Sequence, residues 1–519
     1  MDKKSGIYYY LTDNSLRAGG SSTFGGIVPM YTTKGIPGKV YTVTAMDYRD
    51  KLGYDLDYNP NYAGLDLMLS GVTRLDVIRM NPISYVGNVV WYDDAGTLKD
   101  KVLIEKSAVE VFEDDVRLDG DAKFWVCHVT PGKWGEHSVF FEKTTNTDRD
   151  EYVLHYKDTS GILRKTVFSL DPEEDDFYSK VDFKELVLGF ADSEPEFPAG
   201  FLTQAVPDPS KPSFSDSFEL KGGSYGEASI DDEVFPVTEI NTWFAPLATS
   251  NANVFVLNGF VNVNKIAESG ELVKALVNYF GSRDISVLID APTVEESEGI
   301  LDAVPLSDWT KSLLDGTTGQ FGQVAAIPGL SGGIKIQPSV YLFQIYSNMF
   351  FTYGHVNFPP AGPTYGTVSA ARLMDSNFHL YGDELKTGRV NYITGTPNGI
   401  CMWEQRTLYS LGGSDLSYAN TVFILRDLKV RLIEFMSQFT FRYSTPIDLL
   451  TIHSGLQSIL DGFVKNMFLV NYTLMVPTYE EAQAAGRELD INIGVSVISD
   501  MEVINLRINL KNAADLRAA

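Results

Sequence analysis

Two different spacings of apolar residues occur in separate parts of the sequence, and they predict two kinds of secondary structure. Residues 84–234 consist of short runs of alternating apolar and polar residues, separated by clusters of Gly, Asp, Asn and Pro. Such alternation is typical of half-buried strands in an antiparallel sheet. On either side, strand-like runs alternate with segments whose apolar residues recur at helical spacing. The pattern therefore predicts an antiparallel β domain inserted into an α/β frame, with an α+β multidomain fold overall.

Within the frame, residues 39–79 follow a β-α-β pattern. Further along, Leu272, Val273, Leu276 and Phe280 form one helical stripe, and the buried strand "ISVLIDAP" follows at 285–292. The run "SVYLFQIYSNMFF" at 339–351 is predicted to be a strand. Helices are predicted at 294–304, 306–316, 367–374, 420–439 and 446–469.

The charge balance excludes some classes of partner. With 42 Lys and Arg against 68 Asp and Glu, the net charge is −26, which opposes binding to nucleic acid or to an anionic membrane. Cys127 and Cys401 are the only cysteines, so we expect no disulfide framework and no zinc site. Since no apolar run reaches 18 residues and the N-terminus does not look like a signal peptide, we expect a soluble chain in a reducing compartment.

Motifs for catalysis are weak. Gly329–Gly333 matches G-x-S-x-G around Ser331, but a nucleophile elbow needs a helix directly afterwards and a strand-like run follows instead. The acidic run at 55–61 has Pro60 where a calcium loop needs Gly. The six histidines form no i,i+4 pair, and there is no P-loop. The sequence thus predicts no enzyme, no catalytic or metal site and no cofactor; a serine hydrolase using Ser331 remains a rival.

Both ends of the chain carry strand-like segments. Residues 501–510 alternate strictly, and "GIYYYLT" at 6–12 precedes a Gly/Ser-rich linker. Two pairings are open for the last strand. It can form a hairpin with the strand at 490–498, whose face carries Ile491, Ile493, Val495 and Val497, or it can pair with another copy of the chain.

Several collinear stretches resemble the contractile tail sheath proteins of myophages and related contractile injection systems. "VTPGKWGEHSVFF" at 129–141 is similar to that family's Pro-Gly-x-Trp-Gly segment, with Glu136 where Asn is usual. The Gly-Gly-x-x-Gly return at 222–226 and the Asp-x-Pro end of "ISVLIDAP" also resemble the family. So does the Pro-Pro-x-Gly turn after residue 358, without the usual Trp. A Trp-x-x-Arg-Thr-Leu element and the long helix after it complete the resemblance, carried by Trp403, Arg406, Thr407 and Leu408.

The resemblance implies a domain arrangement. An inner sheath domain would combine an N-terminal arm, 1–30, with the C-terminal third, 336–519. A middle α/β domain would comprise 31–83 and 235–335, and 84–234 would be the inserted outer β domain. The arms would add strands to neighbouring subunits. The residues implied in this inter-subunit strand addition are Ile7, Tyr8, Tyr9, Tyr10, Ile504, Leu506, Ile508 and Leu510.

The resemblance also implies a function. The chain would be the structural subunit of a phage tail sheath, in the virion after assembly in the host cytoplasm. It would stack in hexameric rings around a tail tube and contract to drive the tube through the host envelope for DNA ejection. Its partners would be itself, the tail tube protein, and baseplate and tail terminator proteins, with no nucleic acid and no direct membrane insertion. Glu480, Glu481 and Arg487 would face the tube.

Two alternatives to a phage tail sheath stay open. A bacteriocin or another phage-like contractile injection system would use the same architecture. A receptor-binding tail protein is a further candidate, because the chain has 27 Tyr and 30 Phe.

Overall fold

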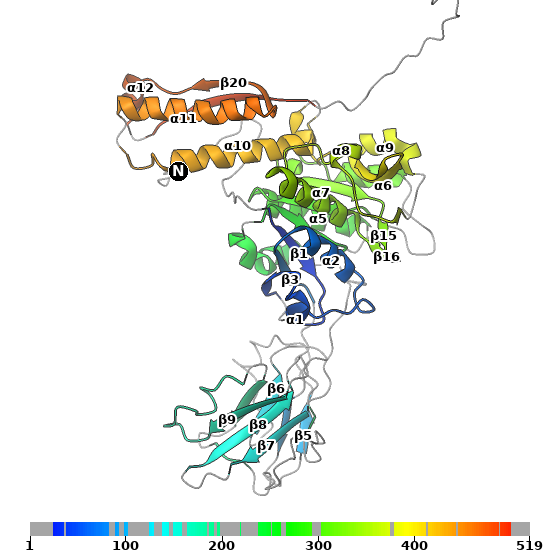
Figure 1. Ribbon diagram of the computed structural model, residues 1–519, viewed down its shortest axis with the longest axis vertical. Coiled ribbons are helices and arrows are strands. Elements are labelled where there is room, and N and C mark those ends of the chain that lie inside the picture. Colours follow the sequence, from blue (N-terminus) through cyan, green and yellow to red (C-terminus); the bar gives the residue numbers. More distant parts are fainter. Residues whose placement is uncertain are drawn as a thin grey trace, which may run out of the picture.

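The computed structural model of the chain shows a mixed α/β protein with several sheets (Figure 1). It describes residues 24–35, 38–81, 89–92, 98–101, 124–128, 138–144, 149–157, 163–183, 186–190, 195–197, 218–219, 237–250, 252–260, 266–292, 303–373, 378–411, 414–442, 445–486 and 488–499. Along its longest axis, the inserted β region, a central α/β body and a helical module follow one another. The mixed α/β, multidomain character predicted from these two patterns of apolar residues is confirmed.

The body is built on an eight-stranded sheet in the order β19-β18-β14-β13-β12-β1-β3-β2. Its six central strands are parallel, while β19 and β2 run antiparallel at the two edges. Every residue of β1, β12, β13 and β14 is buried, so both faces of the sheet are covered. The strands are β1 (Gly26–Met30), β2 (Val40–Val43), β3 (Leu75–Arg79), β12 (Val254–Val256), β13 (Ser286–Asp290), β14 (Gly322–Ala326), β18 (Val390–Thr396) and β19 (Gly399–Trp403).

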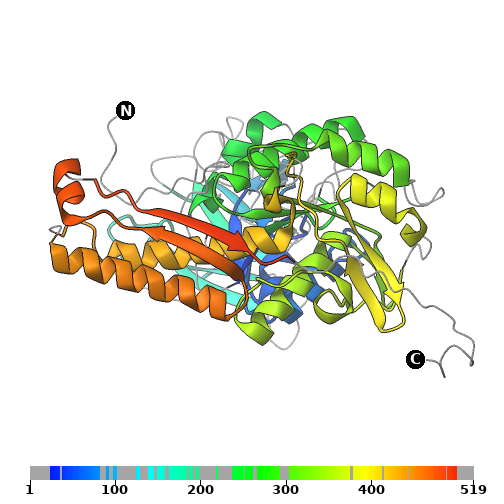
Figure 2. The ribbon, with the colours of Figure 1, turned by 90° about the horizontal axis from the view of Figure 1, so that it is seen from above.

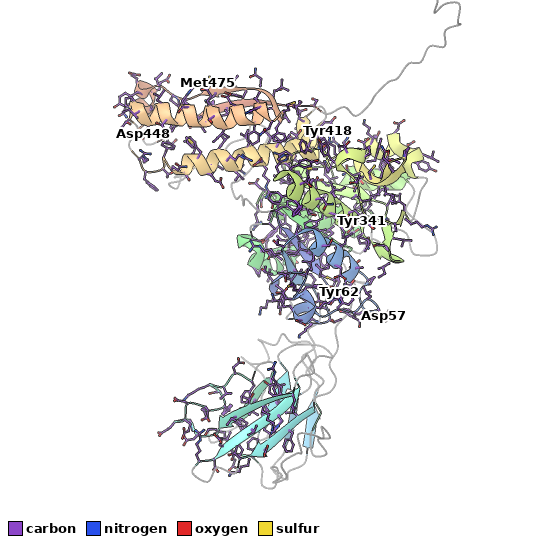
Figure 3. All side chains as sticks on the ribbon, in the orientation of Figure 1. Asp57, Tyr62, Tyr341, Tyr418, Asp448 and Met475 are labelled. Carbon is purple, nitrogen blue, oxygen red and sulfur yellow. The ribbon has the colours of Figure 1, made fainter. Side chains whose placement is uncertain are left out.

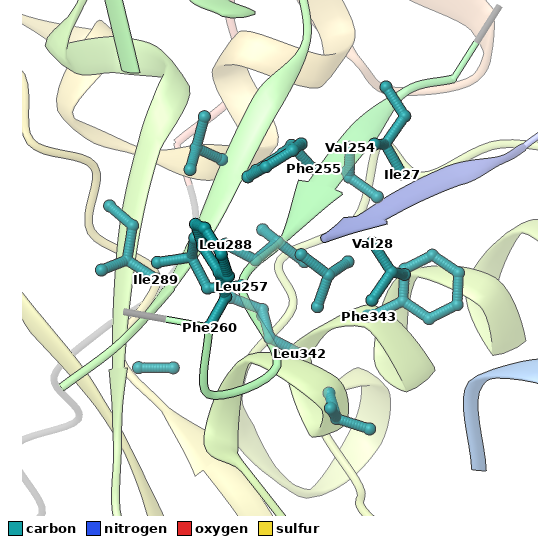
Figure 4. Close-up of a cluster of buried hydrophobic side chains, with 14 of the residues drawn as sticks. Ile27, Val28, Val254, Phe255, Leu257, Phe260, Leu288, Ile289, Leu342 and Phe343 are labelled. Carbon is teal, nitrogen blue, oxygen red and sulfur yellow. The ribbon is translucent and has the colours of Figure 1, made fainter. Parts of the chain in front are cut away.

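Short and medium helices cover this sheet, and their apolar faces form one core with it. Phe280 of α5 stacks on Phe255 of β12 with ring centroids 4.1 Å apart, and Leu342 and Phe343 of α7 meet the strands in Figure 4. The predicted stripe on α5 and the predicted strand β13 are confirmed. The helices of the body are α1 (Tyr48–Leu52), α2 (Tyr62–Gly71), α4 (Ile240–Trp243), α5 (Ile266–Gly281), α6 (Ala303–Ser312), α7 (Pro338–Tyr353), α8 (Gly362–Tyr365) and α9 (Gly382–Thr387).

The prediction of a strand at 339–351 is wrong, because this segment forms the helix α7. Pro338 occupies the first turn, where proline is favoured, and Gly354 ends the helix in the left-handed region with φ 74°. The Asp290 carboxylate at the end of β13 accepts hydrogen bonds from the backbone N–H of Ser339 and of Gly259, both at 2.8 Å. Because most of the helix is buried, it is apolar on nearly all sides and gives no periodic signal.

The prediction of a helix at 367–374 is also wrong. Arg372–Leu373 form β17, which pairs with β15 (Gly329–Ser331) beside β16 (Ile334–Ile336) in a three-stranded sheet. Val368 donates its backbone N–H to Ile400, so the chain before β17 also lies along a strand. Tertiary pairing overrides the helical propensity of the alanines here.

The inserted region contains two four-stranded sheets, in the orders β10-β6-β4-β5 and β11-β7-β8-β9, and all their pairings are antiparallel. Their buried residues form a core separate from that of the body. The antiparallel strand pairing predicted for this region is therefore confirmed for the described strands. They are β4 (Val89–Tyr92), β5 (Leu98–Lys101), β6 (Phe124–His128), β7 (Ser138–Lys143), β8 (Glu151–Lys157), β9 (Leu163–Ser169), β10 (Leu186–Phe190) and β11 (Phe218–Glu219).

The helical module comprises residues 419–499. It contains α10 (Ala419–Ser437), α11 (Pro446–Lys465), β20 (Leu469–Met475), α12 (Tyr479–Ala485) and β21 (Asn492–Val497). Seen from above, it extends to one side of the sheet (Figure 2). The helices predicted at 420–439 and 446–469 are confirmed, except that the second ends at Lys465.

The expected division into domains stays a prediction, and the core of the body includes residues on both sides of positions 30 and 336. Residues 26–30, assigned to the N-terminal arm, form β1 between β12 and β3. The inner domain was expected to begin at residue 336, yet α7, β18 and β19 share one core with β12 and β13. The strands among these elements belong to a single sheet, and α7 packs on its central strands.

Candidate assembly surface

Helix α10 joins the body to the helical module, because successive residues of its first half belong to different cores. Phe423 packs in the core of the body. Val422 and Leu425 join a small cluster with Tyr409. Ile424 starts the core of the module. A single continuous helix therefore contributes to the cores of both the body and the module, and Figure 3 labels Tyr418 at this junction.

Buried charges fix this helix to the body. Lys429 pairs with Asp284, and both side chains are almost fully buried. Arg426 donates from Nη1 to the carbonyl of Asn253 at 2.8 Å. Burial lowers the pKa of Lys429 to about 8 and that of Arg426 to about 10. Removing one member of a buried ion pair leaves an uncompensated charge. The contacts of Lys429 and Arg426 therefore hold this part of α10 against the body.

The element at 403–408 holds the start of the same helix. Thr407 donates from Oγ1 to Leu416 at 2.7 Å, and Leu408 donates its backbone N–H to Gly322. The Arg406 guanidinium lies over the Tyr418 ring, 4.5 Å from its centroid. The residues that carried the resemblance thus tie β19 and β14 to the N-terminus of α10, which is a structural role.

Helix α11 packs along α10 through a stripe at helical spacing: Leu449, Ile452, Leu456, Leu460 and Phe463 are all buried. Gly455 allows the close approach, because an added Cβ there would clash with the ring of Phe435. Thr445 caps the N-terminus by accepting a hydrogen bond from the Asp448 N–H at 3.1 Å, and Pro446 follows in the first turn.

Strands β20 and β21 form a two-stranded antiparallel sheet in the described part of the chain. Its inner face packs on the helices through Tyr472, Leu474, Ile493, Val495 and Val497. Its outer face exposes large apolar side chains, with Val470 60% and Met475 64% accessible. A sheet of two strands leaves two edges whose N–H and C=O groups are ready to pair with further strands. The strand β20 was not predicted, although the alternation of Tyr472 and Leu474 with polar neighbours is typical of a strand.

The predicted strand-exchange residues Ile7, Tyr8, Tyr9, Tyr10, Ile504, Leu506, Ile508 and Leu510 lie outside the described residues, as does Arg487. Of the two pairings left open for 501–510, neither is tested. The strand at 490–498 takes β20 as a partner on one side. The described chain begins and ends close to the first half of α10, since Phe24 and Phe423 line one cavity and Val497 packs on the cluster of Val422.

The other two residues expected to face the tube, Glu480 and Glu481, lie in α12 and are exposed. The Glu481 carboxylate completes a capping box: it accepts from the Thr478 N–H at 2.8 Å, while the Thr478 hydroxyl accepts from the Glu481 N–H. The hydrogen bonds that the Thr478 N–H and hydroxyl donate to this carboxylate lower the pKa of Glu481. Glu481 therefore stabilises the turn between β20 and β21, whatever else it contacts.

The candidates for catalysis and calcium binding, Ser331 and the acidic run at 55–61, lie in a β-hairpin and in a hydrogen-bonded loop. Ser331 is exposed at the end of β15, and the chain turns through Gly332 and Gly333 into a strand, so the geometry of a nucleophile elbow is absent from this described hairpin. The Asp55 carboxylate accepts from two backbone N–H groups of its own loop, at 3.0 and 3.1 Å. No cluster of potential metal ligands occurs among the described residues. None of the helices described is both long and apolar enough to span a membrane.

Comparison with known proteins gives fold relatives. No protein family model matches the chain, and no curated protein sequence is similar to it. The sheath tail protein of Listeria innocua superposes with a TM-score of 0.56 at 10% identity, over 93% of this chain and 96% of that protein. The sheath tail protein of Desulfitobacterium hafniense gives a TM-score of 0.52 at 12% identity, over 91% and 93%. The resemblance detected in the sequence is thereby confirmed for the fold: this chain has the fold of the sheath tail proteins.

Proposed function

We propose that the chain is a structural subunit of a contractile sheath and not an enzyme. The observation that carries the proposal is the fold, which the chain shares with two sheath tail proteins over more than nine-tenths of its length. A fold alone does not specify a function. The projecting helical module with its two-stranded sheet adds support, because such a sheet is suited to completion by other copies.

The linkage between subunits would be strand addition. Ile7–Tyr10 from one neighbour and Ile504–Leu510 from another would pair with the open edges of β20 and β21. Main-chain hydrogen bonds would supply affinity, and the alternating apolar residues would fix the register. Because both described ends of the chain lie close to the first half of α10, each arm starts beside the module that it would leave.

In the assembled sheath, the helical module would lie on the inside, around a tail tube, with Glu480, Glu481 and Arg487 towards the tube. The inserted β sheets would lie outside. Hexameric rings would stack between a baseplate and a tail terminator. Contraction would rotate rigid subunits outward while the exchanged strands stay paired, and this would drive the tube through the host envelope for DNA ejection. The net charge of −26 would keep copies apart until specific contacts form.

The setting of the sheath would be a myophage virion assembled in the host cytoplasm. A bacteriocin or another phage-like injection system would use the same subunit. A genomic neighbourhood with capsid and terminase genes favours the phage, and one without them favours the alternative.

The first test is electron microscopy of the purified full-length chain beside a chain that ends at Asp500. We expect the full-length protein to form hollow helical tubes, and the shortened protein to remain as monomers or single rings, because the last strand is missing. Full-length protein that never polymerises, alone or with a tube, would contradict the sheath function. Identical tubes from both proteins would contradict the role of 501–510.

A further inference from the structure

A cavity of about 290 Å³ lies between the C-terminal end of α7 and the middle of α10. Three phenylalanine rings, Phe24, Phe350 and Phe423, line it together with Asn357 and Arg426. Phe24 and Phe350 stack with centroids 6.0 Å apart. The cavity thus combines an aromatic wall with polar groups, as sites that bind an aromatic group with a polar end do.

The two polar residues have hydrogen-bonding capacity left. Asn357 is 2% exposed, and its Oδ1 accepts no hydrogen bond from the residues that the structure describes. Its Nδ2 donates to Asp427 at 3.0 Å. Arg426 is 6% exposed, and its guanidinium makes one hydrogen bond, to Asn253, within the described part of the chain. A guanidinium has five N–H donors, and buried polar groups are normally satisfied.

The nearby carboxylates supply charge but not these hydrogen bonds. Asp284 pairs with Lys429 and attracts Arg426 electrostatically, and Asp427 accepts from Asn357 and from Arg431 Nε at 3.0 Å. The occupant should therefore bring an aromatic ring, a donor for Asn357 and an acceptor for Arg426. A phenol group meets all three requirements, since its hydroxyl both donates and accepts. A carboxylate lacks the donor, and a phenylalanine ring lacks both.

We propose that this cavity binds a tyrosine side chain of the same chain, from Tyr8–Tyr10. The chain position supports this occupant, because residues 1–23 lead directly into Phe24, which is part of the cavity wall. At about 3.3 Å per residue, the stretch between Tyr10 and Phe24 is long enough to fold back onto the wall. A segment tethered so close has an effective concentration in the millimolar range, which favours it over a free copy.

This inference rests on the proposed function for its consequence. The same tyrosines are the proposed N-terminal strand that pairs with a neighbouring subunit. A tyrosine held in the cavity of its own subunit would withhold that strand until assembly, so the cavity would slow polymerisation of free subunits.

The test places the photo-crosslinker p-benzoylphenylalanine at Glu434, an exposed residue at the cavity, in the unassembled full-length chain. Arg431, also exposed at the cavity, is the second insertion position, and Leu450 on α11, 70% exposed, is the control. We expect crosslinks to residues 7–11 from the cavity positions and not from Leu450. In a mixture of isotopically light and heavy chains, the crosslinked peptides should be of one isotope. Crosslinks elsewhere, no crosslinks, or mixed-isotope pairs would overturn the proposal.

The triple change Y8F/Y9F/Y10F tests the chemistry of the occupant. It keeps the rings and removes the hydroxyls, so the crosslink yield should fall about tenfold, as the loss of a hydrogen bond to a charged group predicts. An unchanged yield would contradict the role of Asn357 and Arg426. The crosslinking is measured on unassembled chains, so it can succeed where tubes never form, and the two proposals can fail separately.

Discussion

At the scale of single residues, two glycines of α11 differ sharply in their surroundings. An added Cβ at Gly455 would clash with the ring of Phe435, whereas at Gly462 no described atom lies within 4 Å of the added Cβ. Alanine is favoured over glycine in a helix by about 1 kcal/mol. We therefore expect G462A to raise the free energy of unfolding by about that amount. We expect G455A to lower it by about 1–3 kcal/mol, because the ring must move out of its packed position.

Thermal and urea unfolding of both variants measure this difference. The matched glycine at 462 controls for the intrinsic helix effect, since it lies in the same helix two turns later. Equal stabilisation by both substitutions would show that α10 and α11 do not approach each other as closely as described.

His355 introduces a pH dependence at the junction of the body and the module. Its ring packs edge-to-face on Phe358 and Phe468, and its Nδ1 accepts from the Asn357 N–H at 3.2 Å. Burial lowers the pKa of His355, and the attraction of Asp427, which raises it, is opposed by Arg431. The folded chain therefore binds this proton more weakly than the unfolded chain, so stability falls as the pH drops below about 6.5.

We expect H355Q to lose less stability than the unmodified chain between pH 8 and pH 5, as measured by Tm at each pH. The control is H453Q, which changes a half-buried histidine on α11. His155 in the inserted sheet has its pKa shifted in the same direction by burial, so the comparison uses the difference between variants. A pH response of H355Q identical to that of H453Q would contradict the role of His355.

At the scale of elements, α12 depends on its capping box. T478A removes the acceptor for the Glu481 N–H, and E481A removes the acceptor for the Thr478 N–H. Each change should lower the stability of the β20–β21 connection by about 1 kcal/mol, whereas E480A should be nearly neutral. Hydrogen exchange at the amides of α12 measures this locally. Equal protection in E480A and E481A would show that the box contributes nothing.

Whether the sequence predicts an element correctly depends on how that element is packed. Amphipathic α5 and α11 each have one apolar stripe and were predicted, as were α10 and the strand β13. Helix α7 is buried on most sides, so its run of apolar and aromatic residues has the composition of a strand. Residues 367–373 have helical propensity but pair with β15 and β19, which is information from distant parts of the chain. The module sheet was half predicted, because β21 lies in the strand predicted at 490–498 while no strand was predicted at β20.

At the scale of the whole molecule, α10 joins the body to the helical module, and the Lys429–Asp284 ion pair is buried between α10 and the body. The segments proposed to connect subunits lie outside the described residues. The alternation at 501–510 and the strand-like run at 6–12 predict strands, but their partners belong to other copies in the proposal, so no single-chain pattern could specify those partners.

The central claim is that the two-stranded sheet β20–β21 is completed by other copies of the chain. The measurement that tests it most directly is a helical reconstruction by cryo-electron microscopy of tubes assembled from the full-length chain. We predict a four-stranded sheet at the module, with Ile7–Tyr10 of one neighbour and Ile504–Leu510 of another beside β20 and β21. A sheet that remains two-stranded in the assembled tube, or one completed by its own subunit's termini, would contradict the account.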